Sequence, residues 1–91
     1  MSREQLHLTV AAIVHFEQKF LLVEEIDKQT GQRVLNQPAG HVEQDEDLLS
    51  AVKRELYEET GLRLEPSAWL GISQLKASNG HRYVRLNFIF E

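Results

Sequence analysis

The chain has 91 residues, of which 42% are hydrophobic and 26% charged, so it can form one globular unit and has no room for a second domain. Its formal net charge of −4 argues against a nucleic-acid partner, because phosphate backbones are bound by basic surfaces. It contains no cysteine, which excludes disulfides, thiolate metal sites and a cysteine nucleophile and fits a cytoplasmic protein.

The apolar stretches of the chain are short. The longest, residues 8–14, includes Thr9 and falls far below the roughly 20 residues that a membrane-spanning helix needs. The first residues, MSREQ, lack the apolar centre of a signal peptide. We therefore expect neither a membrane anchor nor export, and a monomer or homodimer in the cytoplasm.

The first third of the chain predicts β-structure. Residues 6–16, LHLTVAAIVHF, are rich in β-branched and apolar types and predict a buried strand. Residues 17–19 predict a turn, after which residues 20–25 return as a second strand and form a hairpin with the first. A polar loop is expected over residues 26–32, and a short strand over residues 34–37.

A single helix is predicted over residues 45–60. Asp45 is placed to accept hydrogen bonds from the free amides of the first turn, and Gly61 can adopt the left-handed conformation that closes a helix. Counting about 100° per residue puts four apolar side chains on one stripe, which we expect to face the core. They are Leu48, Leu49, Val52 and Leu56.

The acidic side chains of this helix lie close to its apolar stripe. On the same count Glu55 and Glu59 border the stripe, Glu58 lies further round, and Arg54 falls on the solvent side. Like charges three or four residues apart repel, and Mg²⁺ or Mn²⁺ would offset that repulsion while leaving room for phosphate oxygens. An ordinary amphipathic helix with a glutamate-rich border accounts for the wheel equally well.

After the helix, the pattern returns to strands. Residues 62–64 and 69–77 predict two strands around a turn at residues 65–67, and Ser78-Asn79-Gly80 predicts a hairpin turn before a last strand over residues 83–90. One face of this last strand is polar and the other apolar. The polar face carries Tyr83, Arg85 and Asn87, and the apolar face Val84, Leu86, Phe88 and Phe90.

The chain has four histidines and one tryptophan, side chains that can contact ligands. His7, His15, His41 and His81 show no metal-ligand spacing, so we interpret them as isolated structural or surface residues, with His41 the one candidate for a substrate contact. Trp69 is interpreted as a core residue rather than as a stacking platform for a base.

The strongest signal is the spacing within residues 40–62, GHVEQDEDLLSAVKRELYEETGL. It resembles the signature of the Nudix hydrolases, G-x5-E-x7-R-E-U-x-E-E-x-G-U with U apolar, and every fixed position is filled. The matching residues are Gly40, Glu46, Arg54, Glu55, Leu56, Glu58, Glu59, Gly61 and Leu62. Residues 36–43, NQPAGHVE, also resemble a subgroup of broad nucleoside di- and triphosphate hydrolases that act on thiamine-pathway pyrophosphates as well.

The resemblance implies an α/β fold of the Nudix type, an α/β/α sandwich around a mixed sheet. Nudix domains are usually longer and carry further strands and a second helix on the opposite sheet face. We therefore expect residues 1–91 to be an N-terminal portion of a single Nudix domain that lacks those elements. Its last strand would then be an uncovered edge, which invites pairing with another chain.

The resemblance also implies roles for the matching residues. Glu58 and Glu59 would bind the metal, Glu55 would be a third ligand or the base that activates water, and Gly40 would offer its backbone carbonyl to the metal. Arg54 would hold the glutamates by charge-assisted hydrogen bonds.

Two further acids have open roles: Glu46 would support the junction between loop and helix, and Glu43 could reach a second metal. The implied cofactor is Mg²⁺, which Mn²⁺ may replace. The implied reaction is hydrolysis of a diphosphate linkage in nucleoside di- or triphosphates or related X-linked diphosphates. The alternatives are a pyrophosphatase for ADP-sugars or dinucleotides and a non-catalytic nucleotide-binding module, although such modules generally lose the glutamates that are all present here.

Overall fold

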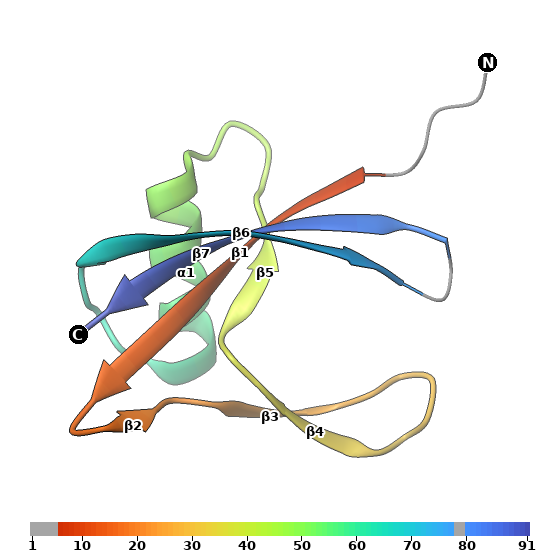
Figure 1. Cartoon of the computed structure of the whole chain (residues 1–91), viewed down its shortest axis with the longest axis horizontal. Coiled ribbons are helices and arrows are strands. Elements are labelled where there is room, and N and C mark those ends of the chain that lie inside the picture. Colours follow the sequence, from red (N-terminus) through yellow and green to blue (C-terminus); the bar gives the residue numbers. More distant parts are fainter. Residues whose placement is uncertain (1–5, 78–79) are drawn as a thin grey trace.

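The computed structural model describes residues 6–77 and 80–91, which form seven strands and one helix. In chain order these are β1 (Leu6–Phe16), β2 (Lys19–Phe20), β3 (Val23–Ile26), β4 (Arg33–Asn36), β5 (Ala39–His41), α1 (Leu48–Thr60), β6 (Ala68–Lys76) and β7 (Arg82–Phe90). Figure 1 shows α1 beside the main sheet, while β3 and β4 form a separate two-stranded sheet. No helix among the described residues is long and apolar enough to cross a bilayer.

The main sheet is mixed, as predicted. Its order is β2-β1-β7-β6, and β5 also pairs with β1. The β1–β7 pair is parallel, and the other pairs are antiparallel. Because β7 lies between β1 and β6, the prediction that the last strand is an uncovered edge is wrong, and β6 is the exposed edge instead.

The predicted hairpin between residues 6–16 and 20–25 forms only at its tip. Glu17 and Gln18 both have positive φ, so the turn is tight and β2 pairs with β1 over two residues. The same edge of β1 is then taken by β5, which pairs with residues 9–11. The rest of the predicted second strand therefore leaves β1, becomes β3 and pairs with β4.

The helix begins at Leu48, three residues after its predicted start at residue 45. Asp47, not Asp45, caps it by accepting a hydrogen bond from the Ser50 amide at 2.8 Å. Asp45 instead has a φ of 63°, a left-handed loop conformation that aspartate tolerates. Gly61 ends the helix as predicted, with a φ of 78° and its amide bonded to the Tyr57 carbonyl.

The core lies between α1 and the central strands β1 and β7. Its buried members are Val10, Ala12, Val14, Ala51, Val52, Leu56, Phe88 and Phe90. Phe88 and Phe90, from the apolar face predicted for the last strand, thus lie in the core, and Leu86 packs against it. The prediction that Leu49 lies in the core is wrong, since Leu49 is 50% exposed. The helix α1 contacts both β1 and β5, and the buried face of the helix includes Ala51 in place of Leu49.

After the helix, two predictions are wrong and a third is only partly covered by the described residues. Residues 62–64 form no strand, and the chain reaches β6 through a loop in which the Ser67 amide bonds the Ile89 carbonyl. Trp69 lies on the edge strand β6 with 59% of its surface exposed, so its assignment to the core is wrong. In the predicted hairpin turn, Ser78 and Asn79 lie outside the described residues, while β6 and β7 pair as an antiparallel hairpin.

Candidate active site

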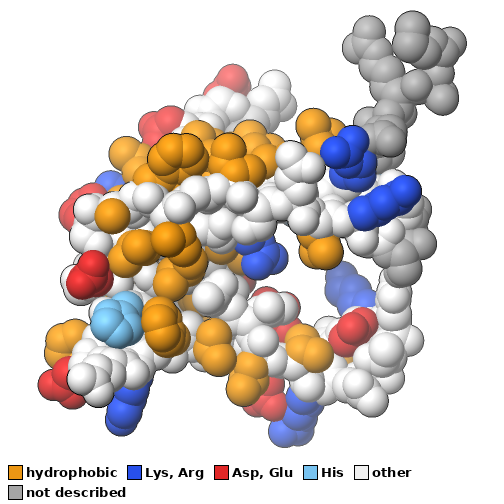
Figure 2. Space-filling model, viewed as in Figure 1, with side chains coloured by type: hydrophobic (Ala, Val, Ile, Leu, Met, Phe, Trp, Pro, Cys, Tyr) orange, Lys and Arg blue, Asp and Glu red, His pale blue; other side chains and the backbone are white. Residues whose placement is uncertain are grey.

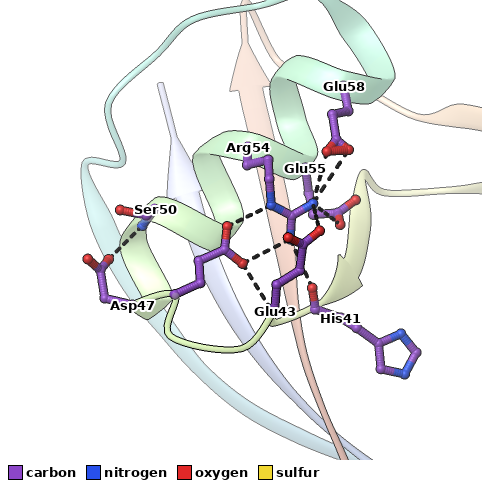
Figure 3. A network of polar contacts seen from close by, with 8 residues as sticks. His41, Glu43, Asp47, Ser50, Arg54, Glu55 and Glu58 are labelled. Carbon is purple, nitrogen blue, oxygen red and sulfur yellow. Dashed lines mark hydrogen bonds and ion pairs between the residues drawn. The ribbon is translucent and has the colours of Figure 1, made fainter.

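Arg54 is the centre of a polar network that ties the loop before α1 to the helix (Figure 3). Its Nε donates to Glu46 Oε2 at 2.6 Å and its Nη2 to Glu46 Oε1 at 3.0 Å, which is a two-pronged contact. Nη2 also donates to the His41 carbonyl at 3.0 Å. The Arg54 side chain is only 23% exposed, so the solvent-facing position given by the helical wheel is wrong, because the long side chain folds back over the loop.

The same guanidinium reaches the acids of the helix. Its Nη1 donates to Glu55 Oε1 at 2.8 Å and to Glu58 Oε1 at 3.0 Å, and lies 3.4 Å from a carboxylate oxygen of Glu43. The hydrogen bonds to Glu46, and after them those to Glu58 and Glu55, raise the pKa of Arg54. Arg54 therefore fixes the orientation of carboxylates from the loop and of the helix residues Glu55 and Glu58.

Glu46 closes the loop onto the helix. Besides the bonds from Arg54, its carboxylate accepts from the Glu43 amide at 3.0 Å. The Arg54 hydrogen bonds, followed by that amide, lower the pKa of Glu46 to about 2. Glu46 therefore joins the loop, through the Glu43 amide, to the helix, through Arg54, as expected.

Glu55 packs directly against the backbone of β5. A Cβ atom added to Gly40 would collide with the Glu55 carboxyl group, whose side chain is only 13% exposed. Gly40 pairs with Val10 at the outer strand of the sheet, so the glycine lets the helix carboxylate approach the strand.

Glu59 lies at the same junction of α1 and β5. Burial raises its pKa, and the negative charges of Glu55, Glu25 and Glu58 add to that effect, while a hydrogen bond from the Ala39 amide acts in the opposite direction. Excess negative charge therefore gathers where the helix meets β5.

The donor set at this junction has the chemistry of a magnesium site. The carboxylates of Glu55, Glu58 and Glu59 and the carbonyl of Gly40 carry oxygen atoms of the kind that Mg²⁺ prefers, and a cation would relieve the repulsion that acts on Glu59. Within residues 6–77 and 80–91, no three acidic or histidine side chains are arranged to hold a metal ion jointly. Glu55 and Glu58 turn to Arg54 instead.

Three histidines that are far apart in the sequence meet in the fold, which sequence spacing did not indicate. His7 Nδ1 lies 3.1 Å from His41 Nε2, and His7 Nε2 lies 2.9 Å from His81 Nδ1. The His7 ring also stacks on Tyr83 with centroids 4.6 Å apart. The interpretation of these three as isolated residues is wrong, and only the register of β1 with β7 could have revealed the contact.

A pocket of about 480 Å³ opens beside β5 on the sheet face that is turned away from α1. Its lining includes Ala39, Gly40 and His41 of β5 together with residues of β1, β3, β4, β6 and β7. Figure 2 shows the hollow between the β6–β7 layer and the β3–β4 hairpin, with basic side chains beside it. The volume suits a small-molecule ligand.

Comparison with known proteins agrees with this arrangement. Residues 5–90 match the family model of the NUDIX domain. Phosphatase NudJ of Escherichia coli K12 is 45% identical over 85 residues, which cover 93% of this chain and 54% of that protein, and NudJ of Shigella flexneri gives the same figures. The chain thus spans about half the length of the curated relatives it matches.

Solved structures show the same fold. A NUDIX hydrolase from Nitrosomonas europaea is 42% identical, with a TM-score of 0.87 over 94% of this chain and 58% of its own. A MutT protein from Methanosarcina mazei Go1 is 25% identical, with a TM-score of 0.86 over 100% of this chain and 67% of its own. The family model covers nearly the whole chain, and the signature in residues 40–62 is complete, so this chain belongs to the Nudix family.

Proposed function

We propose that the protein is a Mg²⁺-dependent hydrolase that cleaves a diphosphate linkage in nucleoside di- or triphosphates or related X-linked diphosphates, including thiamine-pathway pyrophosphates. The main support is the negative charge around Glu59. The charges of Glu55, Glu25 and Glu58 all act on its carboxylate, and a pocket of small-molecule size lies beside this group of acids. A site this acidic repels phosphate unless a cation is present. The name of the NudJ relatives, phosphatase, supports the same reaction class.

In this proposal Glu58, Glu59 and the Gly40 carbonyl hold the ion, and Glu55 is either a third ligand or the base. Bound Mg²⁺ would neutralise phosphate oxygens and lower the pKa of a bound water. Arg54 keeps Glu55 and Glu58 oriented before substrate arrives, so little reorganisation is needed during the reaction. The carboxylate that is not a ligand accepts the proton of the attacking water.

The test is a phosphate-release screen with Mg²⁺. The substrates are nucleoside diphosphates, nucleoside triphosphates, ADP-ribose, diadenosine polyphosphates and thiamine-type pyrophosphates. We expect turnover of at least one nucleoside or thiamine-type phosphate, its loss in excess chelator, and its return with Mg²⁺ or Mn²⁺. Undiminished turnover in excess chelator would contradict the metal-dependent mechanism.

The screen also separates the alternatives. Preference for ADP-ribose or diadenosine polyphosphates would identify a pyrophosphatase for ADP-sugars or dinucleotides. Binding of a nucleotide without release of phosphate would identify a non-catalytic module. The retention of Glu55, Glu58 and Glu59 favours catalysis over that module.

A further inference from the structure

The sheet face turned away from α1 carries a row of polar residues that crosses four strands. Thr9 of β1 pairs with His41 of β5 on one side and with Arg85 of β7 on the other, and Arg85 pairs in turn with Ser73 of β6. Residues paired across a sheet point to the same face. Their neighbours Val10 and Leu86 pack in or against the core under α1, so the polar row faces the other way.

This polar row, defined as His41, Thr9, Arg85 and Ser73, lies along the pocket beside β5. The row begins at the outer strand, where Gly40 meets the helix glutamates, and runs inward across the sheet. With neighbouring strands roughly 4.8 Å apart, the Arg85 backbone lies roughly 10 Å from that of His41. A ligand held at the glutamates can therefore extend over β5 toward Arg85.

Arg85 differs from the other arginines of the described chain in its surroundings. It is half-buried, yet its guanidinium has no ion pair and no hydrogen bond to any group in residues 6–77 and 80–91. By contrast, Arg54 binds several carboxylates, and Arg33 pairs with Glu24.

A guanidinium that loses water without gaining an anion is unfavourable, and its five donors suit phosphate oxygens. The pocket's one lining carboxylate is that of Glu25. Glu25 is exposed, and its charge acts on Glu59 rather than forming a pair with Arg85. The anion that Arg85 lacks within the described chain would therefore come from a ligand in the pocket.

We propose that Arg85 is a specificity-determining residue that binds phosphate oxygens of the substrate away from the helix glutamates. This inference rests on the proposed function. It adds a residue that selects substrates with a second anionic group, beyond the phosphate held at the helix glutamates. Arg85 does not contact the reacting atoms in this account. It binds the substrate equally strongly in the ground state and in the transition state. Its loss should therefore raise KM and leave kcat unchanged.

The test is calorimetric binding of imidodiphosphate, whose P–N–P bridge resists hydrolysis, in the presence of Mg²⁺. Arg85→Gln should weaken binding by about 10- to 100-fold, the range expected for charge-assisted hydrogen bonds. Arg85→Lys should give an intermediate affinity, because it keeps the charge but loses the planar fork. The matched control is Arg63→Gln, since Arg63 lies over the Tyr57 ring on α1 and does not line the pocket.

Melting temperatures of the variants verify that each one is folded. Wild-type affinity in Arg85→Gln, or equal losses in Arg85→Gln and Arg63→Gln, would overturn the assignment, and so would a wild-type protein that does not bind imidodiphosphate. Because the measurement needs no turnover, it is distinct from the substrate screen. A protein that binds the probe through Arg85 but hydrolyses nothing would refute the proposed function and leave the Arg85 assignment standing.

Discussion

At Arg54, one guanidinium satisfies carboxylates from the loop and from the helix. Glu46, Glu55 and Glu58 all accept from it at 3.0 Å or less, so three acids that would repel one another share one cation. The positive charge of Arg54 therefore offsets the repulsion between these acids. Among the described contacts, Glu59 is the acid of this cluster that Arg54 does not bind.

Glu46 gives the network a dependence on pH. Its pKa falls from 4.5 to about 2 on folding, so its contribution to stability is fully present above about pH 4.5 and is lost as pH falls toward 2. The difference in free energy of unfolding between wild type and Glu46→Gln should therefore be largest near neutral pH and shrink between pH 4.5 and 2. Urea unfolding at a series of pH values measures it.

The control for that series is Glu65→Gln, which removes an exposed acid paired with Lys53 and should have a small effect throughout. A Glu46→Gln difference that stays constant from pH 7 to pH 2.5 would mean that the Glu46 carboxylate is not held by Arg54.

Residue roles were predictable from the sequence only where the motif carried them. The resemblance to the Nudix signature implied that Arg54 holds the acids. The helical wheel instead put Arg54 in solvent, because a wheel describes Cβ directions and ignores a long, bending side chain. The contact of His7 with His41 and His81 was not predictable from the sequence, because it depends on which strands become neighbours.

Among the elements, the meeting of α1 with β5 sets the geometry of the candidate site. Gly40→Ala is compatible with the backbone, but its Cβ would meet the Glu55 carboxyl group and force that side chain away from its position. We expect turnover to fall by about 10²-fold, since small displacements of positioned groups are costly.

Gly61→Ala is the matched control for this variant. Gly61 has a φ of 78° with open space around the added Cβ, so the substitution should cost about 1 kcal/mol of stability and leave turnover close to wild type. Activity assays and thermal melts of both variants distinguish the two effects. Full turnover in Gly40→Ala would show that the Glu55 position against β5 does not matter for the reaction.

The elements themselves were predictable where the pattern was long. The first strand, the body and end of the helix, and the last strand follow from apolar periodicity and from Gly61. Their pairing was not predictable, because it depends on competition for strand edges: β5 takes the edge of β1 that a longer hairpin would have used. Asp45 and Asp47 are both good caps, and only the loop conformation decides between them.

For the molecule as a whole, the edge strand β6 is a surface that favours association. Trp69, Leu70, Ile72 and Leu75 are each more than half exposed on it. An unpaired edge with apolar side chains is a site for pairing with another chain. We expect the 91-residue chain to self-associate as its concentration rises.

Ile72→Lys should shift this equilibrium toward the monomer, because a charge on an edge strand opposes pairing. Leu35→Lys, at a similarly exposed position on β4, should have less effect. Sedimentation velocity over a range of concentrations measures both. A wild-type chain that stays monomeric at every concentration would contradict this reading of β6.

Glu59→Gln tests most directly the proposal that the glutamates of α1 hold a catalytic cation. The substitution keeps the size of the side chain and removes the charge that a cation needs, so Mg²⁺-dependent turnover should fall by about 10²-fold or more. The melting temperature without metal should hold or rise, because burial and neighbouring acids already disfavour the charged form of Glu59. Glu65→Gln should retain turnover in the same assay. Near-wild-type turnover in Glu59→Gln, with a lowered melting temperature, would contradict the claim and leave the helix acids a structural role alone.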